Sequence, residues 1–357
     1  SNELCEKISK LIVKTFPTEC QSTYFVAPIS KKHSLSNKSI PARGKLINMW
    51  KNRDYENKKD ENWNDSESNS ENDDNEEDIQ FQQSYEWLFH NRTPWDLVLF
   101  HWNCTFNNRH LHWKTSQDTQ LIHIFKKWPI LSMPDSYKLI QRDFIDMKIC
   151  NTEITIKTWM DFLNKLIKKT NINKRDDTAG ALIESVNDLA KDEDKVAAML
   201  MLISHLIPPK GMLRLNKKYY KASIADSKDS IIRHITSANN IQDLKEEVIN
   251  KAKILDISVQ PYIIVAGPEI SKITHSYVCV DNILYNAVST LKAFDICFKL
   301  YHVFHVKYPI FSEHLWLLFQ RGLYKFTTKW DKIIPHIENL INYMNKTYKD
   351  TQQIEET

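Results

Sequence analysis

Apolar residues recur at helical spacing through most of the chain. In segment 81–106 the apolar stripe breaks at Thr93 and Pro94 and resumes at Trp95. Threonine is favoured as a helix N-cap and proline as the first helical residue, so we expect a helix to begin there with Thr93 as its cap. Similar stripes continue in segments 120–146, 155–169 and 178–207. The pattern predicts a helical domain of about five or six elements over residues 81–209.

A different pattern follows in QPYIIVAGPEISKITHSYVCVDNILYNAV, residues 260–288. Its β-branched and aromatic runs predict three strands, at 262–266, 277–280 and 283–287. Asp281 and Asn282 tolerate positive φ, which favours a two-residue hairpin turn between the last two strands. The apolar segment 289–306 is then a helix that packs on this sheet. His275 falls in the loop between strands, at the rim of the sheet, without an assigned role.

The rest of the C-terminal segment carries helical patterns. We expect Asp226 or Ser227 to cap a helix that runs through Ile232 and Ile235, and an amphipathic helix over 240–255. Further helices follow residue 306. The predicted fold is mostly α with a small β-sheet (α+β), comprising the helical middle domain, a C-terminal α+β domain over 210–347 with an approximately three-stranded sheet, and a tail over 348–357.

The N-terminal part divides by charge. Residues 1–53 form a basic segment with one short helix before Pro17 and a second near Trp50. Residues 54–78 contain twelve acidic residues against two lysines, although the whole chain has a net charge of +3. Such a composition buries too little apolar surface to fold, so residues 54–80 are predicted to be an acidic disordered linker. It could act as a solubilising spacer or as an autoinhibitory mimic of nucleic acid.

Glycine and cysteine usage narrows the classes of protein. Only five glycines occur in 357 residues, which disfavours phosphate-binding loops and nucleophile elbows. The six cysteines show no CxxC pair or disulfide spacing, which predicts reduced thiols in an intracellular protein, nuclear or cytoplasmic. No run of 18 apolar residues occurs, so no membrane partner is expected.

Histidine clusters raise the possibility of a metal site. Candidate ligands are His101, Cys104, His110 and His112, and separately His302 with His305. A zinc site needs three or four converging ligands, usually as two spaced pairs. Aromatic residues flank these candidates and no second pair matches them, so we predict no metal site and no cofactor.

Catalytic residues are equally weakly indicated. Cys279 and Cys297 lie near histidines but within apolar segments, where thiols are ordinarily small buried groups. Asp281 lies in the predicted turn and Asp295 on a helix, so neither suggests the paired carboxylates of a two-metal nuclease. We expect no catalytic residues and a protein that is not an enzyme.

Two basic segments, 31–53 and 210–221, mix lysine and arginine with tryptophan and tyrosine. This combination contacts phosphates and stacks on bases, whereas the alternative is a solvated basic face or one neutralised by acids. The candidate nucleic-acid-binding residues are Lys31, Lys32, Arg43, Lys45, Lys51, Arg53, Lys210, Arg214, Lys217 and Lys218.

Several strings occur in an order that resembles one protein family. They are PARGKLINMWKNR, SYEWLFHNRTPWDLVLFHWNCTFNNR, KKWPILSMPDSYKLIQRDF, VQPYIIVAGPEI, SYVCVDNILYNAVSTLKAFDICFKLYHVFHVKYP and LWLLFQRGLYKFTTKWDK. They look like a family of uncharacterised, multicopy proteins of arthropod and fish genomes, similar in distribution to genes spread by mobile elements. The resemblance implies no activity for any residue, but it favours a nucleic-acid-linked or partner-binding role.

The leading hypothesis is a non-enzymatic interaction protein that binds a protein partner or self-associates. Tryptophan, tyrosine and arginine dominate interface hot spots. The tryptophans to inspect for exposure are Trp87, Trp95, Trp102, Trp113, Trp316 and Trp330, most of which we expect to be buried. The alternative is a protein that binds DNA or RNA, derived from or associated with a mobile element.

Overall fold

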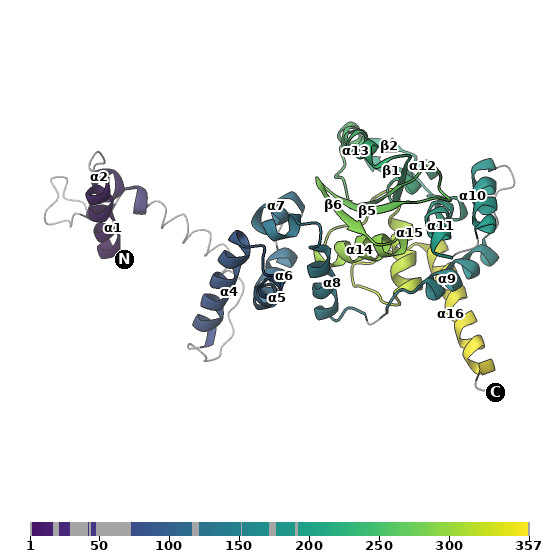
Figure 1. Cartoon of the computed structure of the whole chain (residues 1–357), viewed down its shortest axis with the longest axis horizontal. Helices are drawn as coiled ribbons and strands as arrows, with labels where there is room; N and C mark the ends of the chain where they lie inside the picture. Colours follow the sequence, from purple (N-terminus) through teal and green to yellow (C-terminus); the bar gives the residue numbers. More distant parts are fainter. Residues whose placement is uncertain are drawn as a thin grey trace. The chain divides into compact units, whose positions relative to one another are not determined.

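The computed structural model describes residues 2–16, 21–28, 42, 44–47, 73–115, 121–150, 152–170, 176–189 and 192–355. Two compact units are found, Ser1–Asp73 and Asp74–Thr357, and Figure 1 colours them along the sequence. Most of the basic segment 31–53 and residues 54–72 of the acidic stretch lie outside the described residues.

The N-terminal unit contains helix α1 (Asn2–Thr15) and the short helix α2 (Gln21–Tyr24). The predicted helix before Pro17 is therefore confirmed. Its small core consists of Cys5, Phe25, Leu46 and Ile47.

The larger unit begins with a series of helices. These are α4 (Asp73–His90), α5 (Trp95–Cys104), α6 (Phe106–Thr115), α7 (Leu121–Lys127), the 3₁₀ turn η2 (Pro129–Ser132), α8 (Tyr137–Asp146), α9 (Ile156–Lys169), α10 (Asp177–Asp188) and α11 (Asp192–Leu206). Two sequence predictions need correction. Residues 73–80, predicted as part of the disordered linker, are the first turns of helix α4. Pro94 rather than Thr93 is the N-cap of α5.

The remaining elements mix strands and helices. They are β1 (Leu213–Leu215), β2 (Lys218–Tyr220), α12 (Ile224–Asp229), β3 (Ile232–Ile235), η3 (Ala238–Asn240), α13 (Ile241–Leu255), β4 (Tyr262–Ala266), β5 (His275–Val280), β6 (Ile283–Ala287), α14 (Thr290–Val303), α15 (Glu313–Leu318), the π-helical turn η4 (Phe319–Leu323) and α16 (Pro335–Glu355). The expected α+β class, mostly helical with a small sheet, is confirmed.

The main sheet has four strands in the order β3-β4-β5-β6. Strand β3 pairs parallel with β4, and β4, β5 and β6 form an antiparallel meander. The three predicted strands and the turn are confirmed, with Asp281 at φ 50°. The helix predicted through Ile232 and Ile235 was wrong, because α12 is capped by Ser223 and ends at Asp229. The apolar run that follows pairs with β4 as strand β3.

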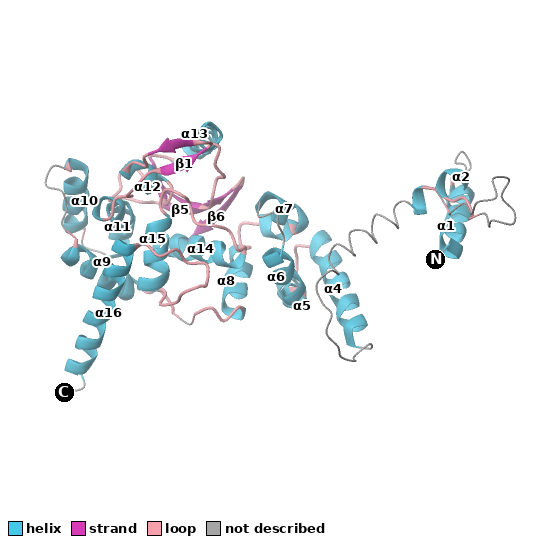
Figure 2. Ribbon diagram, turned by 180° about the vertical axis from the view of Figure 1, so that it is seen from behind, coloured by secondary structure: helices cyan, strands magenta, loops and turns pink. Residues whose placement is uncertain are grey.

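Both faces of this sheet are covered, which explains the continuous apolar run of β4. Ile263 and Val265 belong to the large cluster that includes α14, whereas Ile264 and Ala266 pack in a second cluster with Leu244 of α13. Figure 2 shows α13 and α14 on opposite sides of the strands. All five residues of β4 are buried, as expected for a strand between two layers.

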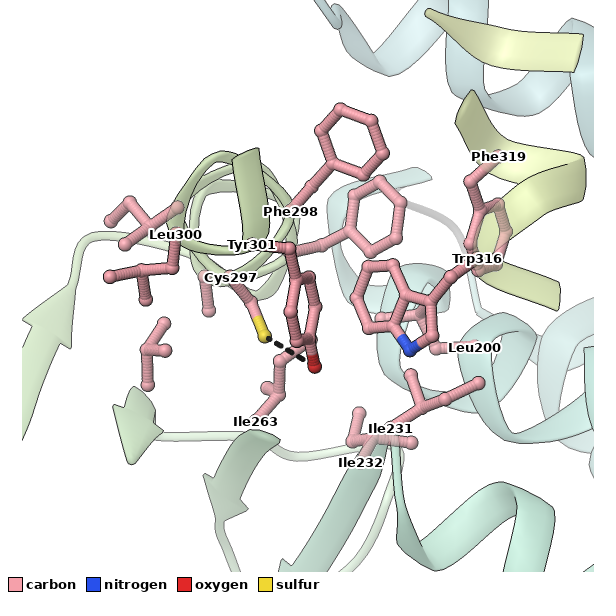
Figure 3. Close-up of a cluster of buried hydrophobic side chains, with 14 of the residues drawn as sticks. Leu200, Ile231, Ile232, Ile263, Cys297, Phe298, Leu300, Tyr301, Trp316 and Phe319 are labelled. Atoms are coloured by element: carbon pink, nitrogen blue, oxygen red, sulfur yellow. Dashed lines mark hydrogen bonds between the residues drawn. The ribbon is translucent and has the colours of Figure 1, made fainter. Parts of the chain in front are cut away.

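A single hydrophobic cluster joins the helical segment to the C-terminal segment. It runs from Leu88 of α4 to Met344 of α16 and includes Leu200, Phe298 and Trp316 (Figure 3). Residues before and after position 209, the predicted domain boundary, therefore pack in one core.

Gly267 allows the chain to turn closely after β4. A Cβ atom at this position would lie 2.2 Å from the carbonyl oxygen of Lys272. Any larger residue would push away the loop that leads into β5, because real Cβ atoms do not approach backbone so closely.

Candidate functional site

The basic segment 210–221 forms a two-stranded hairpin. Strands β1 and β2 pair antiparallel, with Leu215 opposite Lys218. Asn216 and Lys217 between them have φ values of 42° and 63°, the geometry of the two-residue turns that suit strand twist. The hairpin was not among the predicted strands, although its alternating Leu-Arg-Leu before an asparagine was a usable signal.

The two faces of the hairpin differ in character. Leu213, Leu215 and Tyr220 pack in a small cluster with Phe311. The cross-strand pair on the other face consists of Arg214 and Tyr219. Tyr219 is 75% exposed, so an aromatic ring stands in solvent beside a guanidinium group.

Five cations lie exposed on or beside this hairpin: Lys210, Arg214, Lys217, Lys218 and Lys221. Residues 208–225 include no acidic residue. Among the described residues, none of the five side chains forms an ion pair or a side-chain hydrogen bond. The hairpin is therefore a concentrated positive surface without internal compensation.

Two other lysines of the same unit are paired with acids. Lys299 Nζ lies 2.8 Å from an oxygen of Asp295, and Lys332 Nζ lies 2.8 Å from one of Glu313. Exposed lysines elsewhere, such as Lys157, Lys168 and Lys253, also form no ion pair among the described residues, so what distinguishes the hairpin is that five such cations lie within twelve residues that include no acid.

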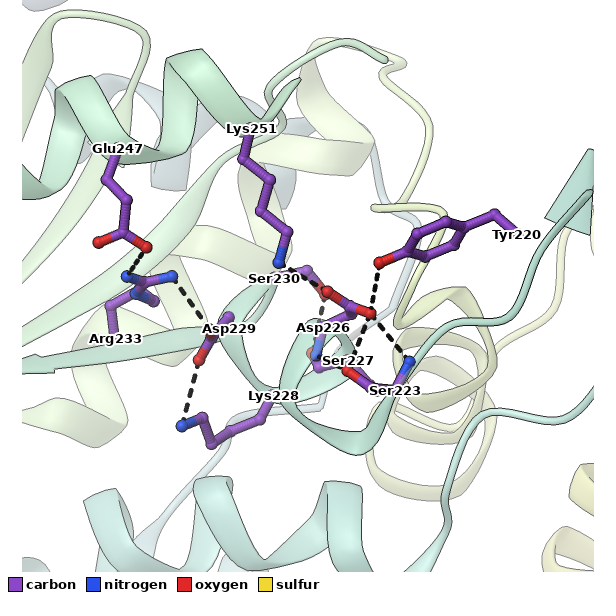
Figure 4. A network of polar contacts seen from close by, with 10 residues as sticks. All are labelled: Tyr220, Ser223, Asp226, Ser227, Lys228, Asp229, Ser230, Arg233, Glu247 and Lys251. Atoms are coloured by element: carbon purple, nitrogen blue, oxygen red, sulfur yellow. Dashed lines mark hydrogen bonds and ion pairs between the residues drawn. The ribbon is translucent and has the colours of Figure 1, made fainter. Parts of the chain in front are cut away.

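A polar network attaches the hairpin to the body of the unit (Figure 4). Tyr220 donates a hydrogen bond of 2.8 Å to Asp226, which also accepts one of 2.6 Å from Lys251. The Ser223 hydroxyl and backbone N–H donate to the same carboxylate. Burial alone would raise the pKa of Asp226, but these hydrogen bonds outweigh it and lower the pKa to about 2. Asp226 is thus an ionised anchor for β2 and α12.

The predicted basic residues do not all fall together. Lys210, Arg214, Lys217 and Lys218 share the hairpin and the turn leading into it. Lys45 is exposed in the N-terminal unit, with Nζ 5.5 Å from the ring centroid of Tyr24. Lys31, Lys32, Arg43, Lys51 and Arg53 lie outside the described residues. Tyr219 and Lys221 were not predicted as contacts, because only the strand register identifies which side chains face solvent.

The histidines of α5 and α6 have structural contacts. His101 stacks on Trp87 with ring centroids 4.5 Å apart, and His110 Nε2 lies 3.0 Å from an oxygen of Asp143. His112 Nε2 lies 3.2 Å from Lys127 Nζ. Within the described ranges, no group of three or more histidine, cysteine or acidic side chains is placed to hold a metal ion.

The candidate catalytic residues do not come together as a catalytic set. Cys279 and Cys297 are buried, and burial raises the pKa of both thiols. Asp295 accepts hydrogen bonds from Lys299 and Tyr324. Burial raises the pKa of the turn residue Asp281.

His275 is the first residue of β5 rather than a loop residue. Its side chain is exposed, and Nδ1 lies 3.0 Å from the Thr274 hydroxyl. Its ring stacks with Tyr277 at a centroid distance of 6.0 Å, a surface contact along one face of the strand.

Exposure separates the tryptophans that were singled out. Trp102, Trp113 and Trp316 are buried, and Trp87 and Trp95 are partly buried. Trp330 is 79% exposed.

Comparison with known proteins gives no relative. No protein-family model, curated protein or solved structure matches the chain. Among the helices described, none has the length and apolar character needed to span a bilayer.

Proposed function

We propose that the protein binds single-stranded nucleic acid through hairpin β1–β2. The observation that carries this proposal is the set of five exposed, unpaired cations on and beside the hairpin, together with the exposed ring of Tyr219. Cations supply affinity for the phosphate backbone by releasing counterions, and an exposed aromatic ring stacks on an unpaired base.

Removing three hairpin cations is expected to abolish most of this binding. For the variant Arg214→Ala, Lys217→Ala, Lys218→Ala, fluorescence anisotropy with a labelled oligothymidylate of about 12 nucleotides should show weaker binding at every salt concentration. If all five cations contact phosphates, log K for the wild type should fall against log[salt] with a slope of about −3.5. The variant should lose about 2 from the magnitude of that slope, since each contact contributes about 0.7.

A charge-matched control distinguishes binding at the hairpin from general electrostatic attraction between the protein and the nucleic acid. Lys157, Lys168 and Lys253 are exposed on helices α9 and α13, and replacing all three by alanine also removes three positive charges. This control should retain the wild-type affinity and slope. Equal losses in the two triple variants, or a wild type that does not bind at about 50 mM salt, would refute the proposal.

A second candidate function, self-association, rests on the loop before α16. Trp330 and Ile333 are 79% and 82% exposed. The loop is held by Asp331, which accepts hydrogen bonds from Gln320 and from the Thr328 backbone, at 2.8 and 3.0 Å. A braced loop that presents a tryptophan is typical of an interface hot spot, and we propose a second copy of the chain as its partner.

Sedimentation equilibrium tests this candidate. The variant Trp330→Ala, Ile333→Ala should dissociate at concentrations at least tenfold higher than the wild type, because hot-spot tryptophans contribute 2 kcal/mol or more, roughly 30-fold in Kd. Ile254→Ala, which truncates an exposed aliphatic residue on α13, should leave the association unchanged. A wild type that stays monomeric throughout the concentration range would eliminate the candidate.

A further inference from the structure

A small pocket opens next to the hairpin. It lies between α12, β3, α13, the loop before β4 and residues 309–311, and it has a volume of about 80 Å³. A buried water needs roughly 10–15 Å³ of cavity volume. The pocket therefore has room for about six waters, which is the size of one small ring system. Its apolar wall is formed by Val248, Ala252, Tyr262 and Phe311.

The charged groups around the pocket compensate one another. Asp226 pairs with Lys251 at 2.6 Å, and Arg233 bridges Asp229 and Glu247 at 3.0 and 2.7 Å. Lys228 lies 3.1 Å from Asp229 (Figure 4). Three acids and three cations therefore form a network without net charge. Because no cation is left over for an anion, the pocket suits a neutral group better than a phosphate.

Two uncharged polar side chains complete the lining. Gln260 is half-buried and Ser258 is exposed at the pocket. Neither side chain has a hydrogen-bond partner among the described residues. An amide offers both a donor and an acceptor, which is the combination that pairs with the edge of a nucleobase.

The pocket and the basic hairpin share a wall. Phe311 lines the pocket and also packs beneath the hairpin, with its ring centroid 5.5 Å from that of Tyr220. Tyr220 in turn donates to Asp226, another pocket residue. A strand whose phosphates lie along the hairpin thus passes next to a neutral, partly aromatic cavity.

From these contacts we infer that the pocket receives one unstacked nucleobase of the strand that the hairpin binds. The inference rests on the proposed function, and it assigns the two chemical parts of the ligand to two surfaces. The hairpin cations contact the phosphates, and the pocket holds a base between Phe311 and the α13 wall with Gln260 at its edge. Single strands are then preferred over duplexes, because a paired base cannot enter.

The test blocks the pocket without changing charge. Ser258→Phe places a ring at the exposed pocket mouth, and Ile254→Phe, at a residue of α13 that is 81% exposed and outside the lining, is the matched control. Each full-length protein is titrated with oligothymidylate, with an abasic strand of the same length and with a duplex. Each stacked base corresponds to about tenfold in affinity, so the wild type and Ile254→Phe should prefer the base-bearing strand about 100-fold, about tenfold from the pocket and about tenfold from stacking on Tyr219. Ser258→Phe should keep only the roughly tenfold preference that Tyr219 supplies.

A second variant covers the case in which Ser258→Phe does not fold. Gln260→Ala leaves the pocket open and removes the amide, and it should reduce the preference for the base-bearing strand about threefold without altering affinity for the abasic strand. Undiminished preference in both folded variants, or a wild-type preference no larger than the roughly tenfold expected from Tyr219 alone, would overturn the inference and leave the hairpin proposal standing. Absence of binding to every strand would overturn both.

A protein ligand is distinguished in the same assay. An acidic peptide with one central phenylalanine is added as a competitor. If it displaces the strand from the wild type but not from Ser258→Phe, the pocket takes an aromatic side chain of a protein, and the assignment to a nucleobase is wrong.

Discussion

Asp143→Ala is expected to destabilise the protein by about 3–5 kcal/mol. The Asp143 carboxylate is buried and accepts two hydrogen bonds from Arg109, at 2.7 and 2.8 Å, and one of 2.8 Å from Trp102. The guanidinium carbon lies 3.6 Å from the ring centroid of Trp102, and Trp113 and Trp128 lie nearby. Burial lowers the pKa of Arg109, and Asp143 opposes this effect. Without the carboxylate, a charged group would remain buried among aromatic rings.

Urea denaturation measures this loss. Asp146→Ala is the control, because Asp146 lies on the same helix but forms a surface pair with Arg142 at 2.9 Å. Exposed pairs of this kind contribute about 0.2–1 kcal/mol, so the control should unfold close to the wild-type midpoint. A loss below about 1 kcal/mol for Asp143→Ala would mean that the pair is not desolvated as the structure indicates.

Acidification from pH 6.5 to pH 4 is expected to reduce stability through two histidines. Burial lowers the pKa of His302 and of His314 to about 4, whereas both titrate near 6.5 in the unfolded chain. The unfolded state therefore binds more protons than the folded state between pH 6.5 and pH 4. The contribution of these histidines to the free energy of unfolding is fully present above pH 6.5 and is lost as the pH falls towards 4. At about 1.4 kcal/mol per pKa unit, each histidine contributes up to about 3 kcal/mol to the loss.

The contribution of His314 can be isolated by substitution. Its Nε2 lies 3.0 Å from the carbonyl oxygen of Ile207, and His314→Gln retains a donor that does not titrate. Urea midpoints from pH 7 to pH 4 should fall less steeply for this variant than for the wild type. His90→Gln, at an exposed position, should follow the wild-type curve. If the urea midpoints of all three proteins fall in parallel with pH, protonation of His314 does not destabilise the folded state.

The sequence predicted the strands whose ends are marked by proline, glycine or turn residues. Strand β4 lies between Pro261 and Gly267, and the turn at Asp281 and Asn282 fixes the register of β5 with β6. Strand β3 was missed because isoleucines three positions apart fit a helix as well as a strand. Parallel pairing with β4 makes this segment a strand. Because β4 lies about 30 residues later in the chain, a short sequence window does not contain this information.

The sequence predicted which basic residues belong to the candidate site but not how they are arranged in space. Lys210, Arg214, Lys217 and Lys218 were identified from the composition of segment 210–221. The sequence did not reveal that Tyr219 stands opposite Arg214, since this depends on the turn at Asn216. The pocket was not predictable either, because Lys251 and Phe311 come from distant segments that only the fold brings to Asp226.

The shared core has a consequence for how the protein is made. Leu88 of α4 belongs to the same cluster as Ile341 and Met344 of α16. The core that the first helices of this unit share is therefore incomplete until α16 has been synthesised. During synthesis, Trp159 and Phe162 of α9 emerge well before Phe319 and Met344, the side chains that cover this region. A nascent chain therefore carries exposed aromatic surface until α16 has left the ribosome, which is the condition under which chaperones bind.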